Sequence, residues 1–170
     1  MHVQSLFLAL VALATMPRLT LSQAHDRARH HSQPATPRDS AFDALQQRGA
    51  RVMGVDQYTS LHRFEALTDG GRIELQRDVD DTAGVRAIRE HLQAVAREFA
   101  AGDFTASATV HGRPVPGSDV MRACRDAIRY EFRPLPRGGE IRITTRDARV
   151  LRAVHEFLAF QRADHRTKQN

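Results

Sequence analysis

The sequence has no tryptophan, one cysteine and one lysine, and each scarcity excludes a class of protein. A single cysteine, Cys124, cannot form a disulfide within the chain, so the fold must depend on its apolar core. Because Lys168 is the only lysine, arginine supplies 24 of the 25 basic residues. These arginines are spread along the chain among Asp and Glu rather than gathered in one patch. Although the net charge is +5, this scattered distribution predicts no nucleic-acid partner.

Long apolar runs are also scarce. The longest, LFLALVALATM at residues 6–16, is too short to span a bilayer. LSQA follows it, with Ser22 and Ala24 at the small-residue positions of a cleavage site. We expect residues 1–24 to be a signal peptide, the protein to be periplasmic or secreted, and no membrane span to remain after cleavage. Since MHVQS has no basic residue and Arg18 interrupts the run, the alternative is a frayed cytosolic N-terminus.

The remaining chain divides by composition. Residues 25–38, HDRARHHSQPATPR, have no apolar periodicity and are predicted to be a disordered tether. Residues 39–166 are predicted to be a single α+β domain, and residues 167–170 a tail. DSAFDALQQRGA predicts a short N-terminal helix, capped by Asp39 or Ser40 and ended by Gly49.

Within this domain one pattern occurs twice, as RFEALTDGGRIELQRD at 63–78 and RYEFRPLPRGGEIRITTRD at 129–147. Each copy predicts a strand, a turn with Gly-Gly, a second strand and an amphipathic helix. The first helix is capped by Asp81 or Thr82, and its apolar stripe is Val85, Ile88, Leu92, Val95 and Phe99. The second helix is capped by Asp147, and its stripe is Leu151, Val154, Phe157, Leu158 and Gln161. We expect strands at 61–67, 72–78, 127–133 and 140–146, so the second turn is two residues longer. One ββα unit cannot bury its apolar face alone. The prediction is therefore a duplicated ββα unit (58–101 and 127–166, joined by a connector at 102–126). It forms a four-stranded antiparallel sheet with two long helices on one face.

Alternation along the strands predicts that Arg and Glu side chains cover the other face of this sheet. The mixed signs favour cross-strand ion pairs on a wet surface, and the alternative is a ligand platform.

Two histidines stand where the second copy has hydrocarbon: His62 against Ile128, and His91 against Phe157. Buried imidazoles need partners, so these positions indicate a polar pocket beneath the sheet. We expect His111 and Met121 of the connector to line it as well.

The histidines also raise the question of a metal. With His155 from the last helix, the candidate ligands are His62, His91, His111 and His155. Four imidazoles would suit Zn²⁺ or Cu²⁺, although their spacing matches no known metal motif. The alternative is that each histidine is half-buried or at the surface and makes one ordinary hydrogen bond. No other cofactor is expected.

Several segments resemble a group of small, exported bacterial proteins without an established activity. They are MGVDQYTSLHRFEALTDGGRIELQRD, IREHL, GDF, VHGRPVPG, LPRGG, RITTRD and HEFLAFQ, within residues 52–166. Some members of the group carry the name aspartate carbamoyltransferase, which this sequence does not support. A transcarbamoylase is a much longer two-domain α/β enzyme. Its Ser-Thr-Arg-Thr-Arg turn and His-Pro-x-Gln motif are absent here.

Common catalytic patterns are also absent: Gly-x-Ser-x-Gly, a Walker loop, a dinucleotide fingerprint and His-Glu-x-x-His. We therefore predict a non-catalytic binding or interaction module, with a protein or a small ligand as partner. The alternatives are a periplasmic Zn²⁺- or Cu²⁺-binding protein and a small enzyme of unknown reaction. Ligand identity and oligomeric state stay open at this point.

Overall fold

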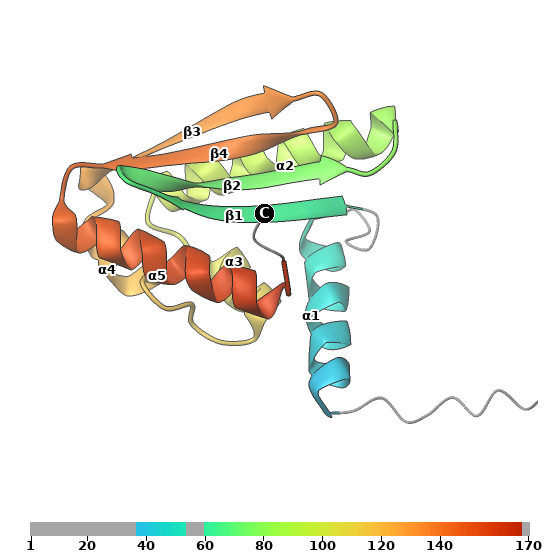
Figure 1. Ribbon diagram of the computed structural model, residues 1–170, viewed down its shortest axis with the longest axis horizontal. Helices are drawn as coiled ribbons and strands as arrows, with labels where there is room; N and C mark the ends of the chain where they lie inside the picture. Colours follow the sequence, from blue (N-terminus) through green and yellow to red (C-terminus); the bar gives the residue numbers. More distant parts are fainter. Residues whose placement is uncertain (1–36, 54–59, 168–170) are drawn as a thin grey trace, which may run out of the picture. The chain divides into compact units, whose positions relative to one another are not determined.

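The computed structural model describes residues 37–53 and 60–167, which form an α+β fold. Four strands make one antiparallel sheet in the order β1-β2-β4-β3 (Figure 1). The elements, in chain order, are α1 (Pro37–Met53), β1 (Ser60–Leu67), β2 (Gly70–Arg77), α2 (Thr82–Ala100), α3 (Thr105–His111), α4 (Ser118–Ala123), β3 (Ile128–Leu135), β4 (Gly138–Thr145) and α5 (Ala148–Asp164). The predicted fold class is confirmed.

Both hairpins have the same dimensions: two eight-residue strands joined by two residues, 68–69 in the first and 136–137 in the second. The prediction of a longer second turn is therefore wrong, because Pro134 and Leu135 belong to β3. Proline is tolerated there because β3 is an edge strand, where the missing N–H breaks no ladder bond. The constant offset is 128 − 60 = 68 residues, so the counterpart of His62 is Tyr130, not Ile128.

Glycines bring the two hairpins together. A Cβ atom on Gly70 would lie 2.0 Å from the carbonyl oxygen of Ile143, and one on Gly138 would lie 2.0 Å from that of Leu75. No side chain fits at such distances from a backbone atom. Glycine at both positions therefore allows β2 and β4 to pair from Gly70 opposite Thr144 to residue 76 opposite residue 138.

The two long helices begin at the predicted caps. The Asp81 carboxylate accepts a hydrogen bond from the Gly84 N–H at the start of α2, and the Asp147 carboxylate accepts two at the start of α5. From there α2 packs mainly against β3 and β4, whereas α5 packs mainly against β1 and β2. Each helix therefore covers the hairpin of the other ββα unit (Figure 1).

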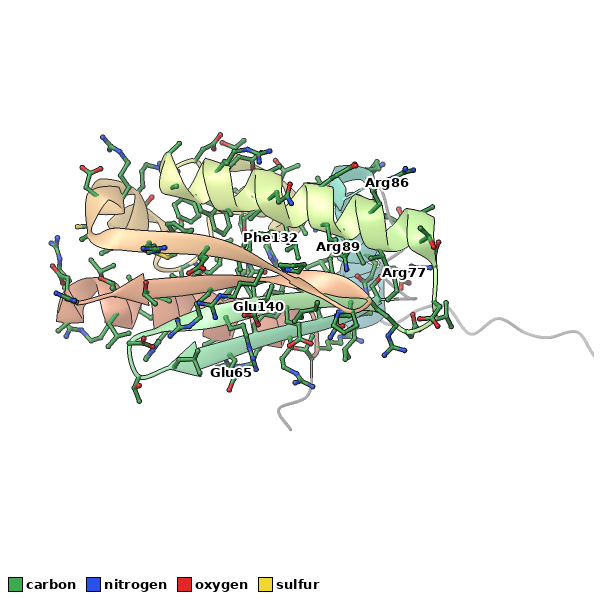
Figure 2. The ribbon with its side chains drawn as sticks, turned by 90° about the horizontal axis from the view of Figure 1, so that it is seen from above. Glu65, Arg77, Arg86, Arg89, Phe132 and Glu140 are labelled. Carbon is green, nitrogen blue, oxygen red and sulfur yellow. The ribbon has the colours of Figure 1, made fainter. Side chains whose placement is uncertain are left out.

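One arginine of α2 forms hydrogen bonds with the β3–β4 hairpin. Arg89 donates to the carbonyl oxygens of Gly138 at 2.9 Å and Leu135 at 2.7 Å, next to the β3–β4 turn. Figure 2 shows Arg89 on α2 beside the strands, with Phe132 between β3 and the same helix. The core between the helices and the sheet contains Phe64, Ile73, Leu75, Ile88, Leu92, Phe99, Ile141, Ile143, Val154, Phe157 and Leu158.

Two local predictions are wrong. Helix α1 begins at Pro37, before the predicted caps Asp39 and Ser40, and continues through Gly49 to Met53, because one glycine inside a helix costs only about 1 kcal/mol in helix propensity. The connector holds an unpredicted helix, α3, which packs against α1. Cys124 is half-buried at the end of α4, and Arg149 donates to its Sγ atom at 2.8 Å. None of the described helices combines the length and apolarity needed to cross a bilayer.

The close approach of β2 and β4 at Gly138 predicts that one added methyl group lowers the stability strongly. We expect Gly138→Ala to lower the free energy of unfolding by roughly 3 kcal/mol or more, because β2 and β4 must separate to admit it. Gly112→Ala is the control, since its nearest neighbour would lie 3.7 Å away and only the left-handed backbone would be strained, at about 1 kcal/mol. Urea unfolding measures both. Equal losses in the two variants would contradict the close approach.

Candidate functional site

A cavity of ≈90 Å³ lies between the sheet and helices α2, α3 and α5. Its wall is mostly apolar, and four imidazoles interrupt it. Three of them, His62, His91 and His165, are half-buried, whereas His111 is buried. The lining residues are Val52, His62, Phe64, Ile73, Leu75, His91, Leu92, Val95, Phe99, Ala106, Ser107, Val110, His111, Phe157, Gln161 and His165.

One ring nitrogen of His62 has no hydrogen-bond partner in this cavity. A hydrogen bond to the Ser60 backbone engages one ring nitrogen. The other, Nε2, is buried and has no hydrogen-bond partner among the described residues. Because a backbone carbonyl accepts a proton, Nδ1 carries the hydrogen and Nε2 keeps its lone pair. A buried acceptor without a partner lowers the stability of the fold by about 1–3 kcal/mol, and a hydrogen-bond donor from a ligand would remove this cost.

Burial keeps the imidazoles of His62, His91 and His165 in the neutral form. Burial lowers the pKa of His62 to about 4, and the charge of His91 lowers it further, against the Ser60 hydrogen bond. Burial, followed by the charges of His62 and His111, lowers the pKa of His165 to about 2. Burial also lowers the pKa of His91. At neutral pH these three rings therefore offer hydrogen-bonding nitrogens without a positive charge.

His111 has both ring nitrogens occupied. Its Nδ1 donates to Asp164 Oδ2 at 2.5 Å, and its Nε2 lies 2.7 Å from Gln161 Oε1. The Gln161 amide in turn donates to Ser107 Oγ at 2.9 Å. The amide stands between the serine and the imidazole, so the four residues do not form a nucleophilic triad. His111 fixes the cavity wall and leaves no nitrogen free for a ligand.

The structure gathers three of the four predicted histidines and separates the fourth. His62, His91 and His111 line one cavity. His155 instead lies 2.9 Å from the carbonyl oxygen of Leu67, where it helps to cap the β1–β2 turn. Met121 belongs to the apolar core and does not line the cavity.

His165 takes the place in the cavity that sequence reasoning assigned to His155. Its ring is stacked on His62 with centroids 5.2 Å apart, and it meets His111 edge-on at 5.2 Å. A signal for it exists in the sequence. Phe157, Gln161 and His165 are four residues apart and continue the buried stripe of α5 by one more turn. The predicted stripe ends at Gln161, one turn too early.

The rings do not form a ready metal site. Stacked imidazoles present faces rather than nitrogen lone pairs to each other. Among residues 37–53 and 60–167, no three His, Cys, Asp or Glu side chains are placed so that they could hold one ion. Binding of Zn²⁺ or Cu²⁺ by the predicted histidines stays a prediction.

Comparison of the chain with protein-family models, curated proteins and solved structures found no match. The resemblance to small exported bacterial proteins therefore stays a prediction, and the cavity must be interpreted from its own chemistry.

The buried imidazoles predict a loss of stability in mild acid. In the unfolded chain His62 and His165 regain a pKa of about 6.5, so below that pH the unfolded state binds protons that the folded state does not. The stabilisation is fully present above pH 6.5 and is lost as the pH falls toward the folded pKa values. At pH 5 we expect a decrease of on the order of 1–2 kcal/mol per histidine.

Urea unfolding at pH 6.5 and pH 5 measures this decrease. The lowered pKa values of carboxyl groups such as Asp69 and Asp147 do not interfere, since those groups titrate at lower pH. His62→Phe removes one titrating ring and should reduce the pH dependence. Identical pH profiles for the variant and the original chain would show that His62 does not titrate as its burial requires.

Proposed function

We propose that this protein is a non-catalytic binding module whose cavity holds a small, mostly apolar molecule carrying one hydrogen-bond donor. The observation that carries the proposal is the buried, unpartnered Nε2 atom of His62 in an apolar wall. A donor from a ligand would satisfy this nitrogen, and the apolar part of the ligand would lie against Leu75, Leu92 and Phe99.

The volume of the cavity limits the size of the ligand that it can enclose. Its ≈90 Å³ is smaller than the apolar cavity of about 150 Å³ that binds benzene in another protein. A five-membered ring or a short branched chain is the expected scale. Because three of the histidines are half-buried, a longer ligand can extend past them toward solvent.

Export of this module is part of the proposal. It rests on the sequence of residues 1–24, which lie outside the described residues.

A matched pair of probes tests the ligand chemistry. Pyrrole and furan are similar in size, but only pyrrole has an N–H that could donate to His62. We expect pyrrole to bind more tightly, by roughly threefold to tenfold, since one hydrogen bond contributes about 0.5–1.5 kcal/mol. NMR titration would report shifts of residues that line the cavity. In His62→Phe the two probes should bind alike.

Two results would refute this assignment. The first is that neither probe shifts the cavity residues. The second is that pyrrole keeps its advantage in His62→Phe. Ala106→Phe, which fills the cavity, is the control for binding elsewhere on the surface.

One observation favours a second candidate, a transition-metal ion. A histidine with Nδ1 on a backbone carbonyl and Nε2 free has the hydrogen-bonding arrangement of a metal ligand. The ring of His165 lies 5.2 Å from that of His62, so a modest side-chain rotation could supply a second nitrogen.

Thermal unfolding of chelator-treated protein with added Zn²⁺ or Cu²⁺ separates the two candidates. If the cavity binds metal, one equivalent should raise the melting temperature, and His62→Ala/His165→Ala should abolish the increase. His155→Ala is the control, since that ring lies outside the cavity. An unchanged melting temperature eliminates the metal and leaves the small-molecule proposal intact.

A further inference from the structure

The face of the sheet opposite the helices carries two adjacent rows of charges. Pairing across β1, β2, β4 and β3 aligns one row as Arg63, Glu74, Glu140 and Arg133, and the next as Glu65, Arg72, Arg142 and Glu131. We call them row one and row two. Every position of row one has the opposite charge at the same strand in row two, so the two rows together have no net charge. Arg129 lies on the same face, one step beyond row two on β3, and adds one positive charge.

The centre of row one is already neutralised within the chain. Glu74 and Glu140 stand directly opposite each other and are each only 7% exposed. Arginines surround them, as like charges in this position require: Arg63 at 4.0 Å from Glu74, and Arg72 at 3.6 Å and Arg133 at 3.8 Å from Glu140. These are the cross-strand ion pairs that the alternation predicts.

The corner charges also belong to ion pairs within the chain, but their side chains project into solvent. The side chains of Arg63 and Arg133 in row one are 39% and 50% exposed, and those of Glu65 and Glu131 in row two are 41% and 42% exposed. The corners are therefore positive in row one and negative in row two. Figure 2 shows Glu65 on the edge strand β1 and Glu140 further inside the sheet.

We propose that this face binds a second copy of the chain through a twofold axis that lies between the two rows and parallel to them. This axis places each strand over the same strand of the partner, and row one over the partner's row two. Arg63 then faces the partner's Glu65, and Arg133 faces the partner's Glu131. An axis parallel to the strands would instead place Arg63 over the partner's Arg133.

Apolar residues at the ends of β1 fit the same arrangement. Leu61, 55% exposed, lies one step beyond row one, and Leu67 lies one step beyond row two. The twofold axis brings Leu61 against the partner's Leu67. A polyanion or a membrane fits this face poorly, because four glutamates and five arginines are interleaved on its strands.

The area of the face limits the affinity. Four strands of eight residues give a flat area of about 500 Å² per copy, below the roughly 800 Å² per partner of a standard interface. The corner ion pairs remain accessible to salt. The dimer is therefore weak and dissociates at high ionic strength.

Sedimentation velocity of the chain without residues 1–24, at protein concentrations up to about 1 mM, tests the proposal. We expect concentration-dependent dimers at low salt and monomers at high salt. Arg63→Glu and Glu65→Arg should each raise the dissociation constant by about tenfold, because each places like charges across the axis. The double variant Arg63→Glu/Glu65→Arg restores opposite charges between copies and should recover the dimer.

The double variant also separates dimerisation from stability. It places a carboxylate opposite Glu74 within the chain and removes the acid that pairs with Arg72, so its melting temperature should stay lowered while the dimer returns. Arg152→Glu, at an exposed position on α5, changes the net charge by the same amount as Arg63→Glu, but away from the face. A monomer under all conditions would overturn the proposal. So would a double variant no tighter than the singles, or equal weakening by Arg152→Glu.

Discussion

The pairing of β2 with β4 is the constraint on which the rest of the structure depends. It joins two hairpins that would otherwise be unable to bury their apolar faces, and it requires glycine at residues 70 and 138. Once the hairpins are joined, α2 and α5 can each cross to the other hairpin. The space that they leave with α3 is the histidine cavity. The same pairing brings the two rows of charge into register on the opposite face.

The features that could be predicted from sequence are those set by local rules. The spacing of Val85, Ile88 and Leu92 predicted the buried face of α2, and Asp81 and Asp147 predicted the starts of both long helices. The histidines at core positions indicated a pocket because an imidazole in an apolar stripe must find a partner. Three of the four predicted rings do line one cavity.

The misses have a common physical origin in tertiary context. Proline and leucine before the second Gly-Gly look like turn residues, and only the edge position of β3 makes Pro134 acceptable in a strand. Helix α3 is short, and its packing against α1 supplies what its sequence pattern lacks. His165 continues the buried stripe of α5 one turn beyond Gln161, but the sequence does not show that its ring meets His62 and His111. The pairing register of a strand and the meeting of side chains in a cavity both depend on parts of the chain that are distant in sequence.

The last turn of α5 supplies part of the cavity wall, and this position has a dynamic consequence. Gln161 and His165 line the cavity there, Asp164 pairs with His111 beside them, and helix ends open more readily than helix centres. A single fraying event would withdraw the partners of His111 and the ring stacked on His62 together. Occupancy of the cavity is thereby coupled to the local opening of one helical turn. A bound molecule would slow amide hydrogen exchange in that turn before it changed the exchange of the sheet.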